Sequence, residues 1–227
     1  MDFNTFLFGL SNAPVKVIAP SVDFGDYVSI DLSTNTEALK DFDTTCSNSW
    51  IVYINQYLQS RNKCIAFGGY LESRSIYNRS NYFNSKSALE ARNIHLGIDL
   101  WCTADTPVLA AFDGVVHSFQ DNTNHGDYGP TIILKHCIDN VEFYTLYGHL
   151  SRSSIKDLKE NTYVSDSQVI GHLGNASVNG DYAPHLHFQI IKNIEDNEGD
   201  YPGVSSQKNL AFYRDNCPDP NLVLKLY

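Results

Sequence analysis

The sequence of 227 residues has little positive charge, because 16 Lys and Arg stand against 26 Asp and Glu and the formal net charge is −10. The basic residues are scattered, and a chain without a basic patch lacks the electrostatic footprint of a nucleic-acid-binding protein. No apolar run approaches the ~20 residues that a membrane-spanning helix needs. We therefore expect neither nucleic acid as a partner nor a membrane span.

Cysteine is also scarce, and none of it forms the C-x-x-C pairs of a four-cysteine zinc site. The five cysteines stand at positions 46, 64, 102, 137 and 217. Their odd number leaves at least one thiol free, which is more typical of a reducing compartment than of a disulfide scaffold. The first residues lack a basic segment ahead of their short apolar stretch, so we expect no signal peptide there.

Aromatic residues are abundant, with 14 Tyr and 12 Phe, and this composition favours strands. Over residues 1–31 the pattern is mixed and predicts strands and turns. Apolar residues then recur at i, i+1, i+4, i+7 and i+8 from Trp50, which predicts a helix over 47–60 with Ser47 as its cap. We expect this helix to pack on the core without a chemical role.

From residue 94 onward the chain reads as a series of short strands. The Asp-Gly dipeptide at 113–114 is a strong turn signal and predicts a hairpin over 107–119. A second hairpin is predicted over 131–150, with its turn at the Asp-Asn dipeptide 139–140. These patterns predict a mainly β chain.

A polar segment rich in Asn, Ser and Tyr covers residues 66–91 and precedes the most informative motif. Long loops in compact domains are often functional, so Tyr70, Glu72 and Arg74 are candidates for lining a substrate groove. The alternative is a solvated cover held by its own hydrogen bonds.

Two short motifs place metal-ligating side chains at strand spacing. His95 and Asp99 are four residues apart and His185 and His187 are two apart, so each pair lies on one face of an extended strand. Gly97 leaves room for close approach between the first two. Two histidines and one carboxylate match the ligand set of a catalytic zinc ion, although the spacing leaves open which of His185 and His187 is the ligand.

A further histidine, His149, ends a predicted strand and is a candidate catalytic residue that does not bind the metal. An imidazole near neutral pKa can move a proton from water to a leaving amine or stabilise an oxyanion. The sequence has no His-Glu-x-x-His motif that would supply a glutamate base on a helix. A single His-x-His motif is weak evidence, but its coincidence with the His95–Asp99 pair and with His149, all in strand-like contexts, predicts one site.

At these motifs the sequence resembles the zinc metalloendopeptidases of the LytM or lysostaphin type, which cut peptide cross-links in bacterial cell walls. The resemblance rests on His-Leu-Gly-Ile-Asp at 95–99, Tyr-Gly-His-Leu at 147–150 and Pro-His-Leu-His-Phe at 184–188. It covers residues 91–192. It implies a fold of the duplicated hybrid motif type, in which antiparallel β-sheets form a narrow groove over the zinc.

The resemblance also implies roles for individual residues. It makes His95, Asp99 and His187 the ligands of one Zn²⁺ per chain, and it makes His149 and His185 the catalytic pair. The implied reaction is attack of zinc-bound hydroxide on a peptide carbonyl, with the zinc and both histidines holding the negative charge that develops.

The segment 179–183 departs from the family pattern, which commonly has a small Ser-Thr-Gly run at this point. Here Asp181 and Tyr182 add charge and bulk to the expected groove wall. We expect Asp181, Tyr182 and Tyr147, the last from the Tyr-Gly-His-Leu motif, to line the groove as well.

The sequence thus predicts a mainly β fold with minor α, in which a small mixed α/β accessory region (1–90) precedes a metallopeptidase domain with a C-terminal wrap (91–227). The expected function is zinc-dependent hydrolysis of peptide bonds in peptidoglycan cross-links or stem peptides. The alternatives are an intracellular zinc amidohydrolase or peptidase acting on a small peptide, and a non-catalytic cell-wall-binding or activator module. The resemblance favours the cell envelope or the exterior, whereas the lack of a signal peptide favours the cytoplasm.

Overall fold

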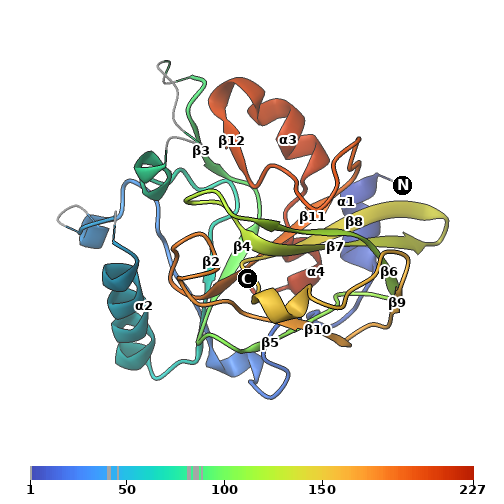
Figure 1. The fold of residues 1–227 in the computed structure, drawn as a ribbon, viewed down its shortest axis with the longest axis horizontal. Coiled ribbons are helices and arrows are strands. Elements are labelled where there is room, and N and C mark those ends of the chain that lie inside the picture. Colours follow the sequence, from blue (N-terminus) through green and yellow to red (C-terminus); the bar gives the residue numbers. More distant parts are fainter. Residues whose placement is uncertain (1, 40–41, 45, 81–82, 84–86, 88) are drawn as a thin grey trace.

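The computed structural model describes residues 2–39, 42–44, 46–80, 83, 87 and 89–227. Strands dominate these residues, as the sequence predicts, and most belong to one large twisted sheet (Figure 1). Its spatial order is β1 (Tyr27–Ser29), β2 (Ile65–Gly68), β4 (Ile98–Trp101), β11 (His185–Ile191), β8 (Val141–Gly148), β7 (Gly129–Ile138), β6 (Gly114–Asn122) and β9 (Tyr163–Val164). Neighbouring strands are antiparallel except for β1 and β2, which run parallel.

Two small antiparallel sheets flank the large one. In the first, β5 (Pro107–Leu109) pairs with β10 (Val169–His172). In the second, β3 (Arg92–His95) pairs with β12 (Val204–Ser206). The second sheet matters for the site, because β3 ends at His95 only three residues before β4 begins.

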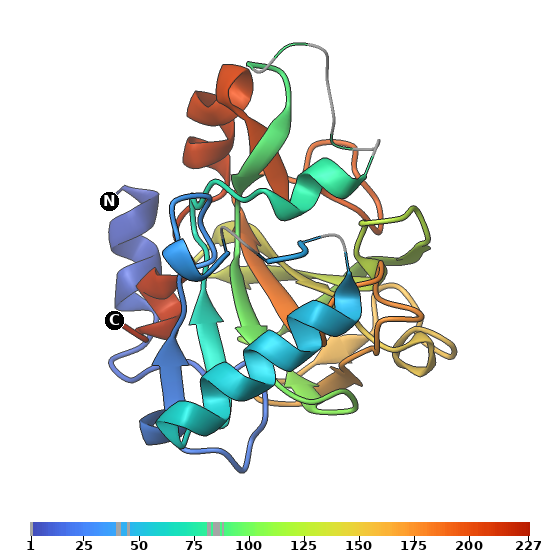
Figure 2. The ribbon, with the colours of Figure 1, turned by 90° about the vertical axis from the view of Figure 1, so that its left-hand side faces the viewer.

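The helices are short and lie around the sheets. The α-helices are α1 (Phe3–Gly9), α2 (Ser47–Arg61), α3 (Leu210–Asn216) and α4 (Asn221–Leu224). The 3₁₀ turns are η1 (Phe24–Asp26), η2 (Glu37–Leu39), η3 (Ile76–Arg79), η4 (Arg152–Ser154) and η5 (Gln207–Asn209). Figure 2 shows α1 and α4 side by side, so the two ends of the chain pack together although they are far apart in sequence.

The hydrophobic core lies on both faces of the large sheet. On one face Phe143, Tyr147 and Phe188 are fully buried with residues of α1 and α4. Trp50 and its neighbours on α2 cover the edge formed by β1 and β2. These contacts join residues 1–90 to the rest of the chain, and β2 hydrogen-bonds directly to β4. The boundary at residue 90 stays a prediction.

Several predicted elements are confirmed. The helix over 47–60 is α2, although Cys46 is its N-cap and Ser47 is its first residue. The hairpin over 131–150 is β7 and β8, with Asp139 and Asn140 both at positive φ (52° and 61°). Both turn residues at positive φ match the twist that a tight hairpin requires.

Two predicted elements are wrong. The hairpin over 107–119 does not form, because β5 pairs with β10 while β6 pairs with β7 and β9. The Asp-Gly dipeptide marks a bend between two sheets and not a tight hairpin turn. The prediction of strands and turns for 1–31 also missed α1, which Asp2 caps through a hydrogen bond from the Thr5 amide (3.1 Å).

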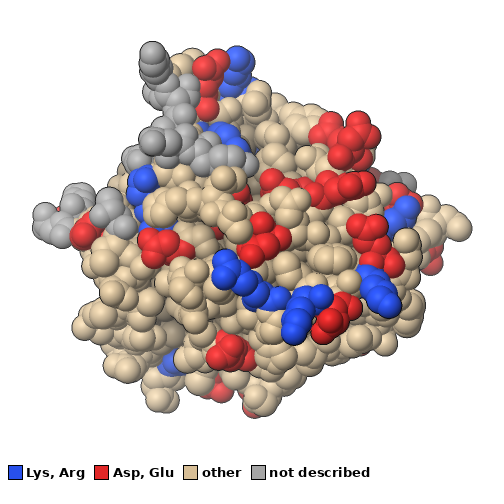
Figure 3. Space-filling view, in the orientation of Figure 1, with Lys and Arg blue, Asp and Glu red and all other residues tan. Residues whose placement is uncertain are grey.

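Within the described residues, no helix combines the length and the apolar character that a bilayer crossing requires. On the face shown in Figure 3, Lys and Arg side chains stand among Asp and Glu and form no continuous basic area.

Candidate metal centre

Adjacent strands of the large sheet bring the predicted site residues together. Asp99 on β4 lies directly opposite His187 on β11, and His187 lies opposite Gly148 on β8. His149 follows Gly148 with a φ of 64°, so the backbone leaves the strand at this residue. The strand register therefore places one carboxylate and two imidazoles at the same end of the sheet.

His95 reaches the same point from the end of β3. Between it and β4 stands Gly97, where an added Cβ atom would lie 2.6 Å from the Phe188 carbonyl oxygen and 2.8 Å from His187 Nε2. Only glycine fits such an approach, so the sequence-based expectation for Gly97 agrees with the contact made here.

Three potential ligand atoms converge in this way. His95 Nε2 lies 2.8 Å from His187 Nδ1 and 3.2 Å from Asp99 Oδ1, and His187 Nδ1 lies 3.1 Å from the same oxygen. All three side chains are at most 2% exposed. Among the described residues this trio forms a group with the spacing of metal ligands.

The hydrogen bonds around the two histidines decide which ring nitrogens carry protons. His95 Nδ1 donates to the Gly69 carbonyl (2.9 Å), and His187 Nε2 donates to Gln189 Oε1 (2.9 Å). The Gln189 amide nitrogen donates to the Pro202 carbonyl, which fixes the orientation of that amide. The nitrogens that face each other are therefore unprotonated acceptors.

Three acceptors in contact, one of them a carboxylate, repel one another unless a cation lies between them. Two imidazole nitrogens and one carboxylate oxygen are ligands that zinc prefers, and a site with three protein ligands keeps a position open. Burial lowers the pKa of His95 to about 4, which keeps this ring neutral as a ligand must be. The residues present therefore fit a zinc ion.

The second oxygen of Asp99 is engaged elsewhere. Arg74 Nη1 donates to Asp99 Oδ2 (2.5 Å). Burial alone would raise the pKa of Asp99, but His95 and Arg74 outweigh it and hold this pKa well below its usual value. Asp99 is therefore a carboxylate with one oxygen left for a metal.

His149 and His185 form a second pair beside the trio. Their ring centroids are 4.1 Å apart, and His185 Nε2 lies 3.9 Å from Asp99 Oδ1. His149 Nδ1 donates to the Asn179 carbonyl (2.8 Å) and His185 Nδ1 donates to the Ala183 carbonyl (2.7 Å). Both Nε2 atoms are thus free to accept a proton, and burial lowers the pKa of both rings.

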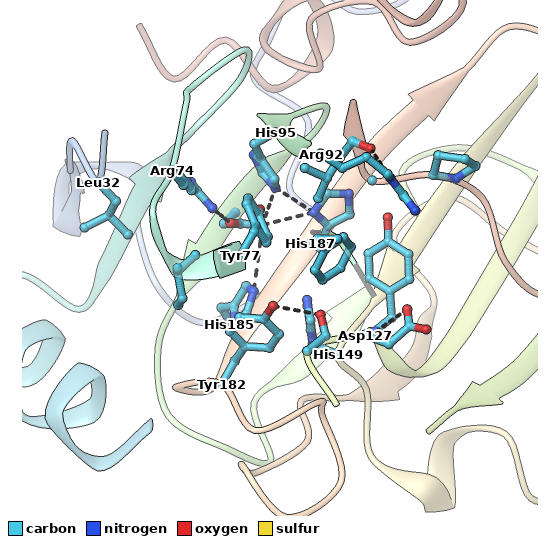
Figure 4. Close-up of a pocket in the computed structure, with 18 of the residues that line it drawn as sticks. Leu32, Arg74, Tyr77, Arg92, His95, Asp127, His149, Tyr182, His185 and His187 are labelled. Carbon is cyan, nitrogen blue, oxygen red and sulfur yellow. Dashed lines mark hydrogen bonds and ion pairs between the residues drawn. The ribbon is translucent and has the colours of Figure 1, made fainter. Parts of the chain in front are cut away.

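All five side chains line one cavity of about 260 Å³. Figure 4 shows the four histidine rings gathered around one point, with Arg74 on one side and Arg92 and Asp127 on the other. The lining includes the apolar residues Leu32, Trp50, Ile76 and Trp101 and the polar or charged residues Arg92, Asp127, Asp200 and Tyr201. The cavity therefore offers both apolar and charged surface around the five side chains.

Of the predicted groove residues, Arg74 and Tyr182 line this cavity. The ring of Tyr182 lies 5.1 Å from that of His149 and 5.7 Å from that of His185. Arg79 places its guanidinium 4.3 Å from the Tyr182 ring centroid and donates to the Asp181 carbonyl (2.7 Å).

The other predicted groove residues lie away from the cavity. Tyr147 is in the core, where its ring packs on Phe188 and its hydroxyl accepts the Ala111 amide (2.8 Å), because strand alternation turns it to the opposite face from Gly148. The Tyr70 hydroxyl donates to the Cys217 carbonyl. Asp181 does not line the cavity; it is half exposed and pairs with Arg79. Glu72 contacts Arg74 instead of the cavity.

Sequence reasoning missed Gln189, Asp127 and Tyr128. Gln189 could have been found, because the alternation that pairs His185 with His187 extends by two residues to Gln189. The Tyr128 ring lies 5.1 Å from His187 and 5.5 Å from His149, but nothing in the sequence near residue 128 predicts this contact.

Comparison with known proteins agrees with this geometry. Residues 93–198 match the model of peptidase family M23. The peptidoglycan DD-endopeptidase ShyC of Vibrio cholerae is 34% identical over 100 residues, which cover 44% of this chain and 20% of that protein. An uncharacterized metalloprotease of Haemophilus influenzae is 32% identical over 96 residues, which cover 42% of this chain and 18% of that protein. The chain spans about a fifth of the length of these curated relatives.

Among solved structures, the catalytic domain of lysostaphin from Staphylococcus simulans is 30% identical to this chain. The match covers 54% of this chain and 80% of that domain, with a TM-score of 0.38.

Proposed function

We propose that this chain, whose residues 93–198 match the model of peptidase family M23, is a zinc-dependent endopeptidase that hydrolyses peptide bonds of peptidoglycan cross-links or stem peptides. The proposed ligands of one zinc ion are His95, Asp99 and His187. The observation that carries the proposal is the convergence of three buried acceptor atoms beside two further histidines whose Nε2 atoms are free.

Zinc at these ligands would lower the pKa of an adjacent water and polarise a peptide carbonyl. The chain's own residues supply the proton transfer. His149 and His185 hold their Nδ1 protons on backbone carbonyls, so each Nε2 can take a proton from the attacking water. The same Nε2–H can then donate to the developing oxyanion or pass the proton to the leaving amine.

Burial favours this role. The neutral forms of His149 and His185 predominate before reaction because burial lowers the pKa of each ring, and His185 lowers that of His149 further. An imidazole that is neutral at the start is a competent base. Since the two rings are in contact, a charge on one opposes a charge on the other, so only one of them takes up a proton at a time.

Peptidoglycan is the proposed substrate because ShyC, whose name describes a peptidoglycan DD-endopeptidase, is similar over the site region. The volume of the cavity, about 260 Å³, favours a second candidate substrate, a short soluble peptide. A non-catalytic binding module has no need of the intact five-residue set.

Release of amino groups from purified peptidoglycan and from a short soluble stem peptide tests the proposal. We expect the His149→Gln variant to lose activity by a factor on the order of 10²–10⁴, the usual contribution of a general acid–base group. His172→Gln is the matched control, because His172 is exposed and does not line the cavity. Equal activity of wild type and His149→Gln, or no release from either substrate, would contradict the proposal.

A further inference from the structure

A chain of buried charges connects the N-terminal part of the molecule with Asp99. The Leu32 amide donates to Glu72 Oε1 (2.8 Å), and Arg74 Nε donates to Glu72 Oε2 (2.5 Å). Arg74 Nη1 then donates to Asp99 Oδ2 (2.5 Å). Arg74 is only 4% exposed. Glu72 and Arg74 stand outside the residues that match the peptidase family.

Backbone pairing fixes the position of this arginine. The Arg74 amide donates to the Asn93 carbonyl (2.9 Å), and the His95 amide donates to the Glu72 carbonyl (3.0 Å). Residues 72–74 therefore run as an extended segment along β3. Because side chains alternate in such a segment, Glu72 and Arg74 project to the same side, toward Asp99.

Gly69 packs against the other side of the guanidinium. It has a φ of 108°, and an added Cβ atom would lie 1.9 Å from Arg74 Nη2 and 2.9 Å from His95 Nδ1. The Gly69 carbonyl also accepts the His95 Nδ1 proton. One glycine thus supports both a proposed ligand and the arginine, and a larger residue would displace both.

We infer that Arg74 is a positioning residue of the metal site: it binds Oδ2 of Asp99 and thereby directs Oδ1 alone toward His95 and His187. The inference rests on the zinc site of the proposed function. A carboxylate with one oxygen engaged coordinates through the other oxygen only, which suits a four-coordinate zinc ion.

Charge balance explains why a cationic side chain is tolerated beside a cation site. Glu72 offsets the charge of Arg74, so the pair adds no net charge next to Asp99. The arginine can therefore orient the carboxylate without repelling the metal. A lysine could not reproduce the arrangement, because its single ammonium lacks the fork that reaches Glu72 and Asp99 together.

The double variant Glu72→Gln/Arg74→Met isolates this role, because it replaces a pair of zero net charge by another pair of zero net charge. Zinc affinity is measured on the full chain by competition with a chromogenic chelator, and the melting temperature of the metal-free protein is measured alongside. We expect zinc affinity to fall by about 10-fold or more, as for the loss of other groups that hydrogen-bond metal ligands. Arg74→Lys, the conservative variant, should be intermediate.

The matched control is Arg79→Met, which removes another buried arginine of the same segment, one that binds Asp181 and not a ligand. Its zinc affinity should equal that of wild type. The cobalt-substituted protein gives a second readout, because four-coordinate cobalt absorbs visible light more strongly than five- or six-coordinate cobalt. We expect the double variant to absorb more weakly, since Asp99 is then free to coordinate through both oxygens.

Three results would overturn the inference. They are an unchanged zinc affinity in both the double variant and Arg74→Lys, an equal loss in Arg79→Met, and an unchanged cobalt spectrum in the double variant. Zinc binding by the wild-type protein distinguishes a failure of the proposed function from a failure of the role proposed for Arg74. If wild type binds no zinc, the proposed function fails as well, whereas zinc binding by wild type with equal affinity in the variants contradicts only the role of Arg74.

Discussion

Each of the four histidines in the cavity donates one ring N–H to an acceptor whose position the fold determines. The acceptors are the backbone carbonyls of Gly69, Asn179 and Ala183 and the side-chain oxygen of Gln189. Each ring therefore turns an unprotonated nitrogen toward the same space. The hydrogen bonds thus hold the four imidazoles in tautomers that suit the proposed metal binding and proton transfer.

Gln189 is the one side chain among these acceptors, and this makes it open to test. We predict that Gln189→Leu lowers zinc affinity by about 10- to 100-fold, because His187 loses the partner that keeps its Nε2 protonated and its Nδ1 free. Chelator competition measures the change. Gln168→Leu, at an exposed glutamine that contacts Ser165, is the control. Equal zinc affinity in Gln189→Leu and wild type would show that His187 needs no such partner.

At the residue level, the sequence could predict four of the five central side chains because strand alternation is a local rule, and it indicated His149 by the end of a predicted strand. His185 and His187 are two apart, and His95 and Asp99 are four apart, so their common faces follow from spacing alone. The contact of Arg74 with Asp99 could not be predicted in this way. It depends on how the segment before β3 pairs with that strand, which is a property of the folded chain.

Among the elements, the three strands β4, β11 and β8 define the site, because they are neighbours in the large sheet and their register aligns Asp99, His187 and Gly148. The hairpin of β7 and β8 was predictable from its turn residues. The pairing of β5 with β10 was not, since these strands are separated by many residues and no turn signal connects them. Local turn chemistry predicts hairpins and not long-range pairings.

The β7–β8 hairpin also carries a pH-sensitive group away from the metal site. His136 on β7 is fully buried; its Nδ1 donates to the Asp113 carbonyl (2.8 Å) and its Nε2 hydrogen-bonds to the Thr145 hydroxyl (2.7 Å). Burial lowers the pKa of His136 to about 4, against about 6.5 in an unfolded chain. As the pH falls between these values, only the unfolded chain binds the proton, so the free energy of unfolding falls and levels off below about pH 4.

We predict that the metal-free protein loses more stability between about pH 7 and about pH 5 than its His136→Leu variant does, by about 2 kcal/mol. Urea unfolding at the two pH values measures the difference. The remaining buried histidines contribute equally to both proteins and cancel. The exposed His172→Leu variant should follow wild type. If the stability of wild type and of His136→Leu fell equally between the two pH values, His136 would bind its proton as readily in the folded chain as in the unfolded chain, and the prediction would be wrong.

At the scale of the whole molecule, the large sheet continues across the predicted boundary at residue 90. β1 and β2 extend it beyond β4, and α1 packs its Phe6 and Leu7 into the main core. Leu32 and Trp50 reach the cavity from the same part of the chain. The sequence predicted groove residues between Tyr70 and Arg74. Periodicity and composition describe each segment alone, so they could not predict that β1, β2 and α1 join the large sheet and the main core.

The match of residues 93–198 to peptidase family M23 agrees with the resemblance seen in the sequence, and the strands confirm a mainly β fold. The roles of individual residues and the identity of the metal remain proposals. Both follow from one physical feature, the contact of three buried acceptor atoms that no proton separates.

Metal content per chain tests that feature most directly. Wild-type protein and His187→Ala are purified in parallel from zinc-containing medium, and zinc is measured by atomic emission against protein concentration. The account predicts about one zinc ion per chain in wild type and a large loss in His187→Ala, because two ligands do not hold a catalytic zinc ion. Folded wild-type protein without zinc, or an equal zinc content in both proteins, would contradict it.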